Sequence, residues 1–363
     1  MYKEKRNILL TGFLFLQIGL VKLASLFPNL VEEYYSRGIY PYLAGALRSG
    51  LGWLKVSVGD LVYAFLLVLL LRFVYRFLSG MIRRTPSWPY RIFDLGAAVS
   101  IFYLVFYSFW GLNYSRVPVA KDLGLSAEKY DIEKIELLTG KLLARTSVLH
   151  ARLSENDSLP VTIPYSRNEI LKMTPAGYKE LSSHLSQYRY ERPSIKKSLF
   201  SLPLTYMGFA GYLNPITGEA QVDSLIPKIS FPMTSSHEVA HQLGIAYEDE
   251  ANFIGFLSAS LHEDPYFNYS AMIFALRYAL SDIRRYDKDL FEQYLERIPP
   301  GVLANMREVD EFWKRYENPL EPLFKGFYDH YLKYNHQKDG LETYNQVMEL
   351  LISFDETHDI DIY

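Results

Sequence analysis

The stretch "SSHEVAHQLGIAYEDEANFIGF", Ser235–Phe256, sets two histidines around a glutamate and follows them with three acids in a row. His237, Glu238 and His241 have the spacing H-E-x-x-H. On a helix, residues four apart share one face, so both imidazoles can reach one ion while Glu238 lies beside them to act on a bound water. The stretch therefore predicts a zinc site and leaves open which acid is the third ligand.

The residues around the histidines predict where their helix begins and ends. Thr234, Ser235 and Ser236 are each suitable N-caps, and the sequence does not choose among them. Gly244 stands where a helix can end in the left-handed conformation. We expect the turn at Gly244 to bring the following acids back toward the histidines.

A catalytic zinc site of this type uses three protein ligands and keeps one position open for water. In the pattern H-E-x-x-H-x-x-G-x-x-H the third ligand is a histidine three residues after the glycine. Here the glycine is Gly244, but the last position is Tyr247. This excludes a standard metzincin and leaves Glu248, Asp249 and Glu250 as candidates.

Helical phase separates the three acids on the helix expected over Tyr247–Leu261. Glu248 shares its face with small residues, which let this helix approach the first one closely, and with Asn252, which can hydrogen-bond a ligating histidine. We therefore expect Glu248 to be the third ligand, with Glu250 as the alternative. The faces are Glu248 with Asn252, Gly255 and Ala259; Asp249 with Phe253 and Phe256; and Glu250 with Ile254 and Leu257.

Three apolar segments lie in the first third of the chain, at about 8–27, 61–78 and 95–112. Each is about long enough to cross a hydrocarbon core of roughly 30 Å. We expect residues 1–113 to form a membrane anchor of three transmembrane helices, and residues 114–363 to form one further domain. The lipid bilayer is thus an expected partner.

Lysines and arginines beside these segments predict their orientation, because basic flanks stay in the cytoplasm. The loop Pro28–Asp60 has a balanced charge, whereas the start of the first segment and the connection between the second and third are basic. We expect a multi-pass protein of the inner cell membrane, with its following domain outside the cytoplasm. The basic residues are Lys3, Lys5, Arg6, Arg72, Arg76, Arg83, Arg84 and Arg91.

Composition narrows the chemistry of the domain. The 363 residues include no cysteine and carry a formal net charge of −3. The absence of cysteine removes disulfides, thiolate catalysis and cysteine zinc sites, so a metal must be held by histidine and carboxylate. Without a basic patch, nucleic acid is not an expected partner.

The remainder of the chain reads as an α+β domain that is mostly helical. Apolar spacing predicts a helix over Ser126–Ser154, with Asp131 able to cap it, and another over Asn168–Tyr188 that kinks or restarts at Pro175. Short β-type runs separated by glycine and proline follow in Gly208–Met233. We expect these runs to form a small sheet just before the histidine motif, with an edge strand able to pair with an extended peptide.

The order of Glu248 and Asn252 looks like the gluzincin arrangement of thermolysin and of membrane zinc proteases, in which Asp stands where this chain has Asn252. The segments "YYSRGIYP", "WGLNYSR", "TGEAQV", "HEVAHQLGIAYEDEANF" and "YSAMIFALRYAL" together resemble the bacterial domain-of-unknown-function 3810 family. Its members are described as membrane-anchored zinc metallopeptidases. The resemblance covers most of the chain and implies a zincin-like metallopeptidase domain behind a membrane anchor.

We therefore expect zinc-dependent hydrolysis of peptide bonds, with Zn²⁺ on His237, His241 and Glu248 and with Glu238 as the general base. The substrate would be a peptide or protein. The alternative is a catalytically inactive zincin-like protein that binds an envelope peptide or protein partner. An oxyanion-stabilising group is also needed, for which the candidates are Tyr269, Arg277, Tyr278 and Tyr344.

Overall fold

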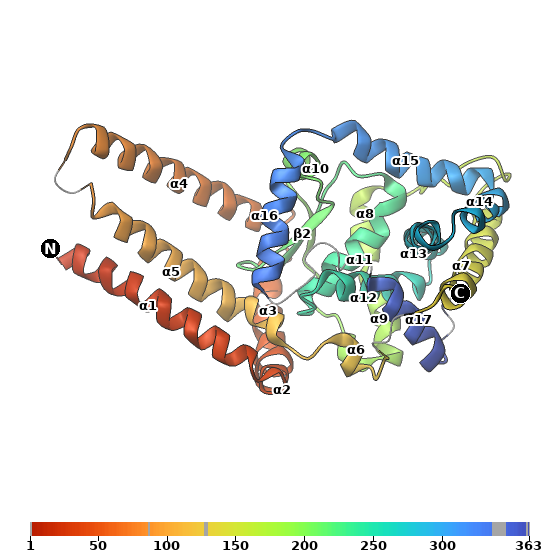
Figure 1. The fold of residues 1–363 in the computed structure, drawn as a ribbon, viewed down its shortest axis with the longest axis horizontal. Helices are drawn as coiled ribbons and strands as arrows, with labels where there is room; N and C mark the ends of the chain where they lie inside the picture. Colours follow the sequence, from red (N-terminus) through yellow and green to blue (C-terminus); the bar gives the residue numbers. More distant parts are fainter. Residues whose placement is uncertain (1, 86–87, 127–129, 336–345, 361, 363) are drawn as a thin grey trace. The chain divides into compact units, whose positions relative to one another are not determined.

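The computed structural model describes residues 2–85, 88–126, 130–335, 346–360 and 362. It is mostly helical and contains one small sheet, as the sequence predicted. The chain divides into two compact units (Figure 1). The first unit comprises Met1–Val117 together with Asn214–Glu219, and the second comprises Pro118–Leu213 and Ala220–Tyr363.

The first unit contains three helices that are long and apolar enough to cross a membrane, in the three places that the sequence predicted. This identifies the chain as a membrane protein. Short helices follow the first of them and precede the second. The elements are α1 (Tyr2–Ser25), α2 (Pro28–Leu30), the π-helix η1 (Val31–Ile39), α3 (Tyr40–Leu51), α4 (Val58–Ile82), α5 (Arg91–Phe109) and the 3-10 helix η2 (Gly111–Ser115).

Helices α1 and α5 pack along each other (Figure 1). Polar side chains lie between them, because Asn7 donates a hydrogen bond to Asp94 (2.6 Å) and Gln17 donates one to Ser100 (3.1 Å). Their outward faces are apolar and exposed. This arrangement suits a lipid environment, where helices associate through polar and small residues rather than through apolar burial.

The π-helix η1 holds an ion-pair cluster around a buried glutamate. Glu32 pairs with Arg116 and Arg37, at 2.7 Å in each case. Burial works to raise the pKa of Glu32, but the hydrogen bonds and charges of the two arginines outweigh it and lower that pKa. Ser36 also donates to Asn113 at 2.9 Å. The segments "YYSRGIYP" and "WGLNYSR" are therefore joined by polar contacts within this unit.

The turn Asn214–Glu219 belongs to the first unit through a buried carboxylate. Glu219 accepts hydrogen bonds from the backbone N–H groups of Val58 (3.3 Å) and Gly59 (2.5 Å), in the first turn of α4. It also accepts one from Thr217 at 3.0 Å. A carboxylate at a helix N-terminus satisfies free N–H groups and the helix dipole, so Glu219 anchors this turn to the end of α4.

The second unit surrounds one large apolar core in which Phe253, Phe256 and Phe267 are fully buried. Helix α7 begins with Asp131 as its cap, as predicted, and the second predicted helix restarts at Pro175. Helix α13 packs along α7, and α11 packs against α12 (Figure 1). The helices are α6 (Val119–Asp122), α7 (Ile132–Leu153), α8 (Arg167–Met173), α9 (Pro175–His184), η3 (Ser186–Tyr188), α10 (Ser201–Met207), η4 (Lys228–Ser230), α11 (Phe231–Gln242), α12 (Glu248–Ser260), α13 (Pro265–Tyr286), α14 (Lys288–Arg297), α15 (Pro300–Tyr316), α16 (Glu321–Tyr334) and α17 (Val347–Thr357).

The small sheet precedes the histidine helix. Its strands are β1 (Ile195–Lys197), β2 (Gly211–Asn214) and β3 (Glu219–Val222), in the order β1-β3-β2. Strand β1 runs parallel to β3, with Ile195 opposite Ala220. Strand β2 therefore lies at one edge of the sheet.

Candidate metal centre

Helix α11 carries the histidine pair and begins earlier than the sequence predicted. It starts at Phe231, with Ser230 in the capping position, so the expectation that Thr234, Ser235 or Ser236 caps it is wrong. Pro232 stands in the first turn, where its missing N–H costs nothing and its fixed φ favours the helix. The hydroxyls of Ser235 and Ser236 instead bond back to the carbonyl of Pro232 inside the helix.

The end of α11 orients His241. Gly244 has a φ of +83°, the left-handed conformation that the sequence predicted for it. The turn brings the carbonyl of Ile245 within 2.7 Å of His241 Nδ1. This contact makes Nδ1 the protonated nitrogen and leaves Nε2 as the one that can bind a metal.

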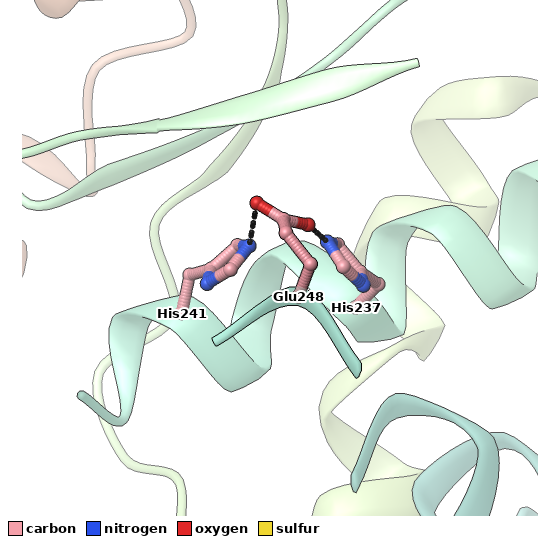
Figure 2. Close-up of side chains that lie close together, drawn as sticks. All are labelled: His237, His241 and Glu248. Carbon is pink, nitrogen blue, oxygen red and sulfur yellow. Dashed lines mark ion pairs between the residues drawn. The ribbon is translucent and has the colours of Figure 1, made fainter. Parts of the chain in front are cut away.

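His237, His241 and Glu248 come together in one cluster (Figure 2). Glu248 Oε2 lies 3.3 Å from His237 Nε2, and Glu248 Oε1 lies 3.7 Å from His241 Nε2. Their candidate ligand atoms all lie within 4.8 Å of one another. A tetrahedral ion with bonds of about 2.0–2.1 Å sets its ligands about 3.3 Å apart, so the three side chains fit a small divalent ion such as zinc.

Close helix packing brings Glu248 to the histidines. A Cβ atom on Gly255 of α12 would lie only 2.8 Å from the backbone nitrogen of His237. A larger residue there would push the two helices apart, since contacts this short are not tolerated. The small residue on the Glu248 face therefore permits the close approach that the sequence predicted.

Charges within the cluster are strongly coupled. Burial works to raise the pKa of Glu248, but the two histidines outweigh it and lower that pKa well below its ordinary value. Burial works to lower the pKa of His241, whereas Glu248 raises it to about 9. For His237 burial prevails and the pKa is lowered. The cluster is thus an anion held between two imidazoles, a donor set suited to a cation.

Glu238 is buried beside this cluster, and its contacts do not fully offset the cost of burying its carboxyl group. Burial raises its pKa to about 8, and the charge of Glu248 adds to the rise. Its Oε2 atom has no hydrogen-bond partner among the residues that the structure describes. A Cβ atom on Gly211 would lie 2.5 Å from Glu238 Oε1, so glycine lets the edge strand β2 pass directly over this carboxylate.

The other two acids of the triplet lie elsewhere. Glu250 is buried and accepts a hydrogen bond from the backbone N–H of Val119 at 2.6 Å, at the start of α6. It does not join the cluster of possible ligands found among the described residues. Burial raises the pKa of Asp249 to about 7. The geometry therefore favours Glu248 over Glu250, while metal binding itself stays a prediction.

Asn252 lies on α12 one turn after Glu248 and is buried. Its side chain is close enough to His237 to work toward a higher pKa of that imidazole. Within the described part of the chain, His237 Nδ1 and Asn252 Nδ2 have no hydrogen-bond partner. Asn252 is therefore correctly placed beside a candidate ligand, and the predicted hydrogen bond between the two stays a prediction.

Tyr328 of α16 is a site residue that the sequence did not single out. Its hydroxyl donates a hydrogen bond to Glu248 Oε1. Its ring packs edge-on against Phe209, with the centroids 5.1 Å apart, and stacks with Tyr331. It stands eighty positions after Glu248 among the 30 tyrosines of the chain, so no local pattern distinguishes it.

The oxyanion candidates expected from the sequence have other surroundings. Tyr269 is fully buried and donates to Asn305 at 3.0 Å, whereas Arg277 pairs with Asp310. Tyr278 is near enough for the charge of Glu248 to contribute to its pKa, which burial raises to about 12. Tyr344 lies outside the described residues. Of the described residues among these candidates and Tyr328, Tyr328 has the most direct contact with the cluster.

A comparison with known protein families identifies the family of this chain. The model of a family described as a protein of unknown function (DUF3810) matches residues 35–352. The match covers far more than half of the chain, so the protein belongs to this family, as its motifs indicated. No curated protein and no solved structure shows a significant match to the chain.

Proposed function

We propose that this protein is a membrane-anchored zinc peptidase. The proposal rests on one observation. Three side chains that can bind a metal lie close together, and a buried glutamate whose charge is not compensated lies beside them. His237, His241 and Glu248 present ligand atoms at distances that suit one ion. Glu238 lies beside them with a carboxylate oxygen that has no hydrogen-bond partner among the described residues, and a purely structural metal site does not need such an acid.

Each side chain has a defined task in this proposal. His237, His241 and Glu248 hold the ion, and Asn252 supports the imidazole of His237. Bound zinc would supply Lewis-acid activation of a water molecule and of the substrate carbonyl. Glu238 accepts the proton of the attacking water and passes it to the leaving amine.

Tyr328 and strand β2 complete the proposed site. The hydroxyl of Tyr328 contacts Glu248 Oε1, so it lies within reach of an oxygen that acquires charge beside the ion. Strand β2 lies at the edge of the sheet and passes over Glu238 at Gly211. An extended peptide that paired with this edge would have its backbone next to the catalytic carboxylate.

We also propose that the second unit lies outside the cytoplasm. The connection Arg83–Arg91 joins the end of α4 to the start of α5, and Asn7 of α1 bonds to Asp94 of α5. The basic residues at the start of α1 and those between α4 and α5 therefore lie at the same end of the first unit, and the positive-inside rule assigns this end to the cytoplasm. A reporter enzyme that is active only outside the cytoplasm, fused after Tyr363, is expected to be active.

The test uses the purified full-length protein loaded with zinc. Wild type is expected to cleave members of a mixed peptide library, and Glu238→Gln is expected to bind zinc equally while losing cleavage. Zinc content of Glu248→Ala and Glu250→Ala provides a matched pair, in which only Glu248→Ala should lose the metal. No cleavage by zinc-loaded wild type, or equal cleavage by Glu238→Gln, would favour a non-catalytic binding protein instead.

A further inference from the structure

Helix α16 carries an apolar stripe that faces outward. Leu323 is 54% exposed, Phe327 69% and Tyr334 53%. Leu320 and Tyr331 belong to the same set. The five residues are spaced three or four positions apart, so they lie on one face of the helix. A helix on the surface of a water-exposed domain normally has a polar or charged outer face, whereas a continuous part of the exposed surface of α16 is apolar.

The other sides of α16 have partners in the second unit. Leu332 is fully buried, and Tyr328 reaches Glu248. Charged residues lie on the flanks, where Lys333 pairs with Asp329 at 2.8 Å and Lys325 pairs with Glu321. Helix α16 thus has a buried inner face and a separate apolar face that is exposed.

Helix α10 enlarges this apolar surface. It packs against α16 (Figure 1), and Leu202 and Tyr206 on it are about half exposed. Asn318, just before α16, donates a hydrogen bond to the carbonyl of Tyr206 at 2.7 Å, and Tyr206 packs edge-on against Tyr316. Exposed leucine, phenylalanine and tyrosine on two packed helices form a patch of the kind that marks an interaction site.

We propose that the α10–α16 surface is seated in the membrane interface and binds lipid. Leucine and phenylalanine with tyrosine beside them are typical of helices that lie in the headgroup region. The chain also limits how far this surface can be from the bilayer. Six residues, 208–213, connect α10 to the turn that Glu219 anchors at the end of α4. An extended segment of that length spans about 20 Å.

Seating α16 on lipid has a consequence for the candidate metal centre. Phe327 of the stripe is followed directly by Tyr328, whose hydroxyl contacts Glu248. The same helix would then contact lipid on one side and the site on the other. The lipid contact does not depend on the proposed peptidase activity. Spin-label accessibility tests the lipid contact, whereas the peptide-cleavage assay tests the peptidase activity.

The test is a depth measurement on the full-length protein in vesicles of phosphatidylcholine and phosphatidylglycerol. Because the chain has no cysteine, Phe327→Cys gives a single attachment point for a spin label, and Leu323→Cys provides a second. Val148→Cys on α7 is the matched control, since Val148 is an equally exposed apolar residue of the same unit (61%). Accessibility to oxygen, which concentrates in lipid, is compared with accessibility to a water-soluble nickel complex.

Labels at Phe327 and Leu323 are expected to meet oxygen and to be shielded from the nickel complex, with the opposite result at Val148. Nickel accessibility at both α16 positions equal to that at Val148 overturns the proposal. Shielding from both reagents overturns it as well, because it would mean that a protein, either a second copy or another partner, covers the stripe.

Discussion

Two buried glutamates of the first unit and one of the second differ in how far their burial is compensated. Glu32 in the first unit is bonded to two arginines, and Glu219 there accepts hydrogen bonds from two backbone N–H groups and a threonine hydroxyl. Glu238 in the second unit is equally buried, yet one of its oxygens finds no partner among the described residues. The two arginines lower the pKa of Glu32, whereas burial raises the pKa of Glu238 to about 8.

We take this difference to distinguish two acids that stabilise the fold from the acid that we propose acts in catalysis. A buried carboxylate that is fully paired stabilises its surroundings, whereas an unpaired one costs free energy and persists where a ligand or reaction uses it. Glu32 and Glu219 hold short segments against the membrane helices. Glu238 adjoins three possible metal ligands and an edge strand. The contrast predicts opposite outcomes when the two kinds of acid are replaced.

The largest expected effect is on turnover. Glu238→Gln should lower kcat by about 10²–10⁴-fold, the usual contribution of a general base. The midpoint of thermal unfolding should not fall, because the amide keeps the side-chain volume and replaces a carboxyl group whose raised pKa, about 8, already leaves it largely neutral at pH 7. Peptide cleavage assays and a thermal melt of the same preparation check both parts. A variant that melts well below wild type would indicate a structural role for Glu238.

Replacing a compensated acid should instead affect folding. Glu32→Ala is expected to lower the free energy of unfolding by about 3–5 kcal/mol, because it leaves Arg116 buried without its carboxylate. Tryptophan fluorescence can follow unfolding in detergent, since Trp53, Trp88 and Trp110 all lie in the first unit. Glu33→Ala is the matched control, because Glu33 is its exposed neighbour. Equal stability of the two variants would contradict a structural role for the ion pairs.

Asn252 should have an intermediate effect on the metal. Asn252→Ala is expected to weaken zinc binding by about 10–100-fold, the usual loss when a residue that orients a ligating histidine is removed. Competition with a chromophoric chelator measures the affinity, and Asn168→Ala, an exposed asparagine on α8, serves as control. Unchanged zinc affinity in Asn252→Ala would show that His237 is oriented by other contacts.

The smallest expected effect is a dependence of the first unit on pH. Because the pKa of Glu32 is lowered by folding, its stabilising contribution is complete above the ordinary value near 4.5. It is lost as the pH falls through the lowered pKa. Unfolding midpoints measured by tryptophan fluorescence from neutral pH downward should therefore decline more steeply for wild type than for Glu32→Gln. Parallel curves would rule out Glu32 as the group responsible.

The sequence predicted the features that depend on local periodicity. Three apolar segments identified the membrane helices by length and composition alone. A period of 3.6 residues distinguished the face of Glu248 from that of Glu250, and the structure places Glu248 alone of these acids beside the histidines. Gly244 and Pro175 fixed a left-handed turn and a helix start, since backbone conformation is most restricted at such residues.

Features that depend on distant contacts could not be predicted. Tyr328 reaches Glu248 only because α16 packs against α10 and the loop at Phe209. Glu219 caps α4 across 160 positions in the chain. Ser235 and Ser236 look like helix caps, yet a proline further upstream starts the helix and both hydroxyls bond to its carbonyl instead. In each case several residues are equally suitable by their local sequence, and tertiary packing determines which of them makes the contact.

The most direct test of the central proposal is anomalous X-ray diffraction at the zinc edge from crystals of the zinc-loaded, full-length protein. We predict one strong peak about 2.0–2.2 Å from His237 Nε2, His241 Nε2 and a carboxylate oxygen of Glu248, with Glu238 beside it and not coordinated. A peak bound to Glu250, or no peak between the two histidines in zinc-loaded crystals, would contradict it.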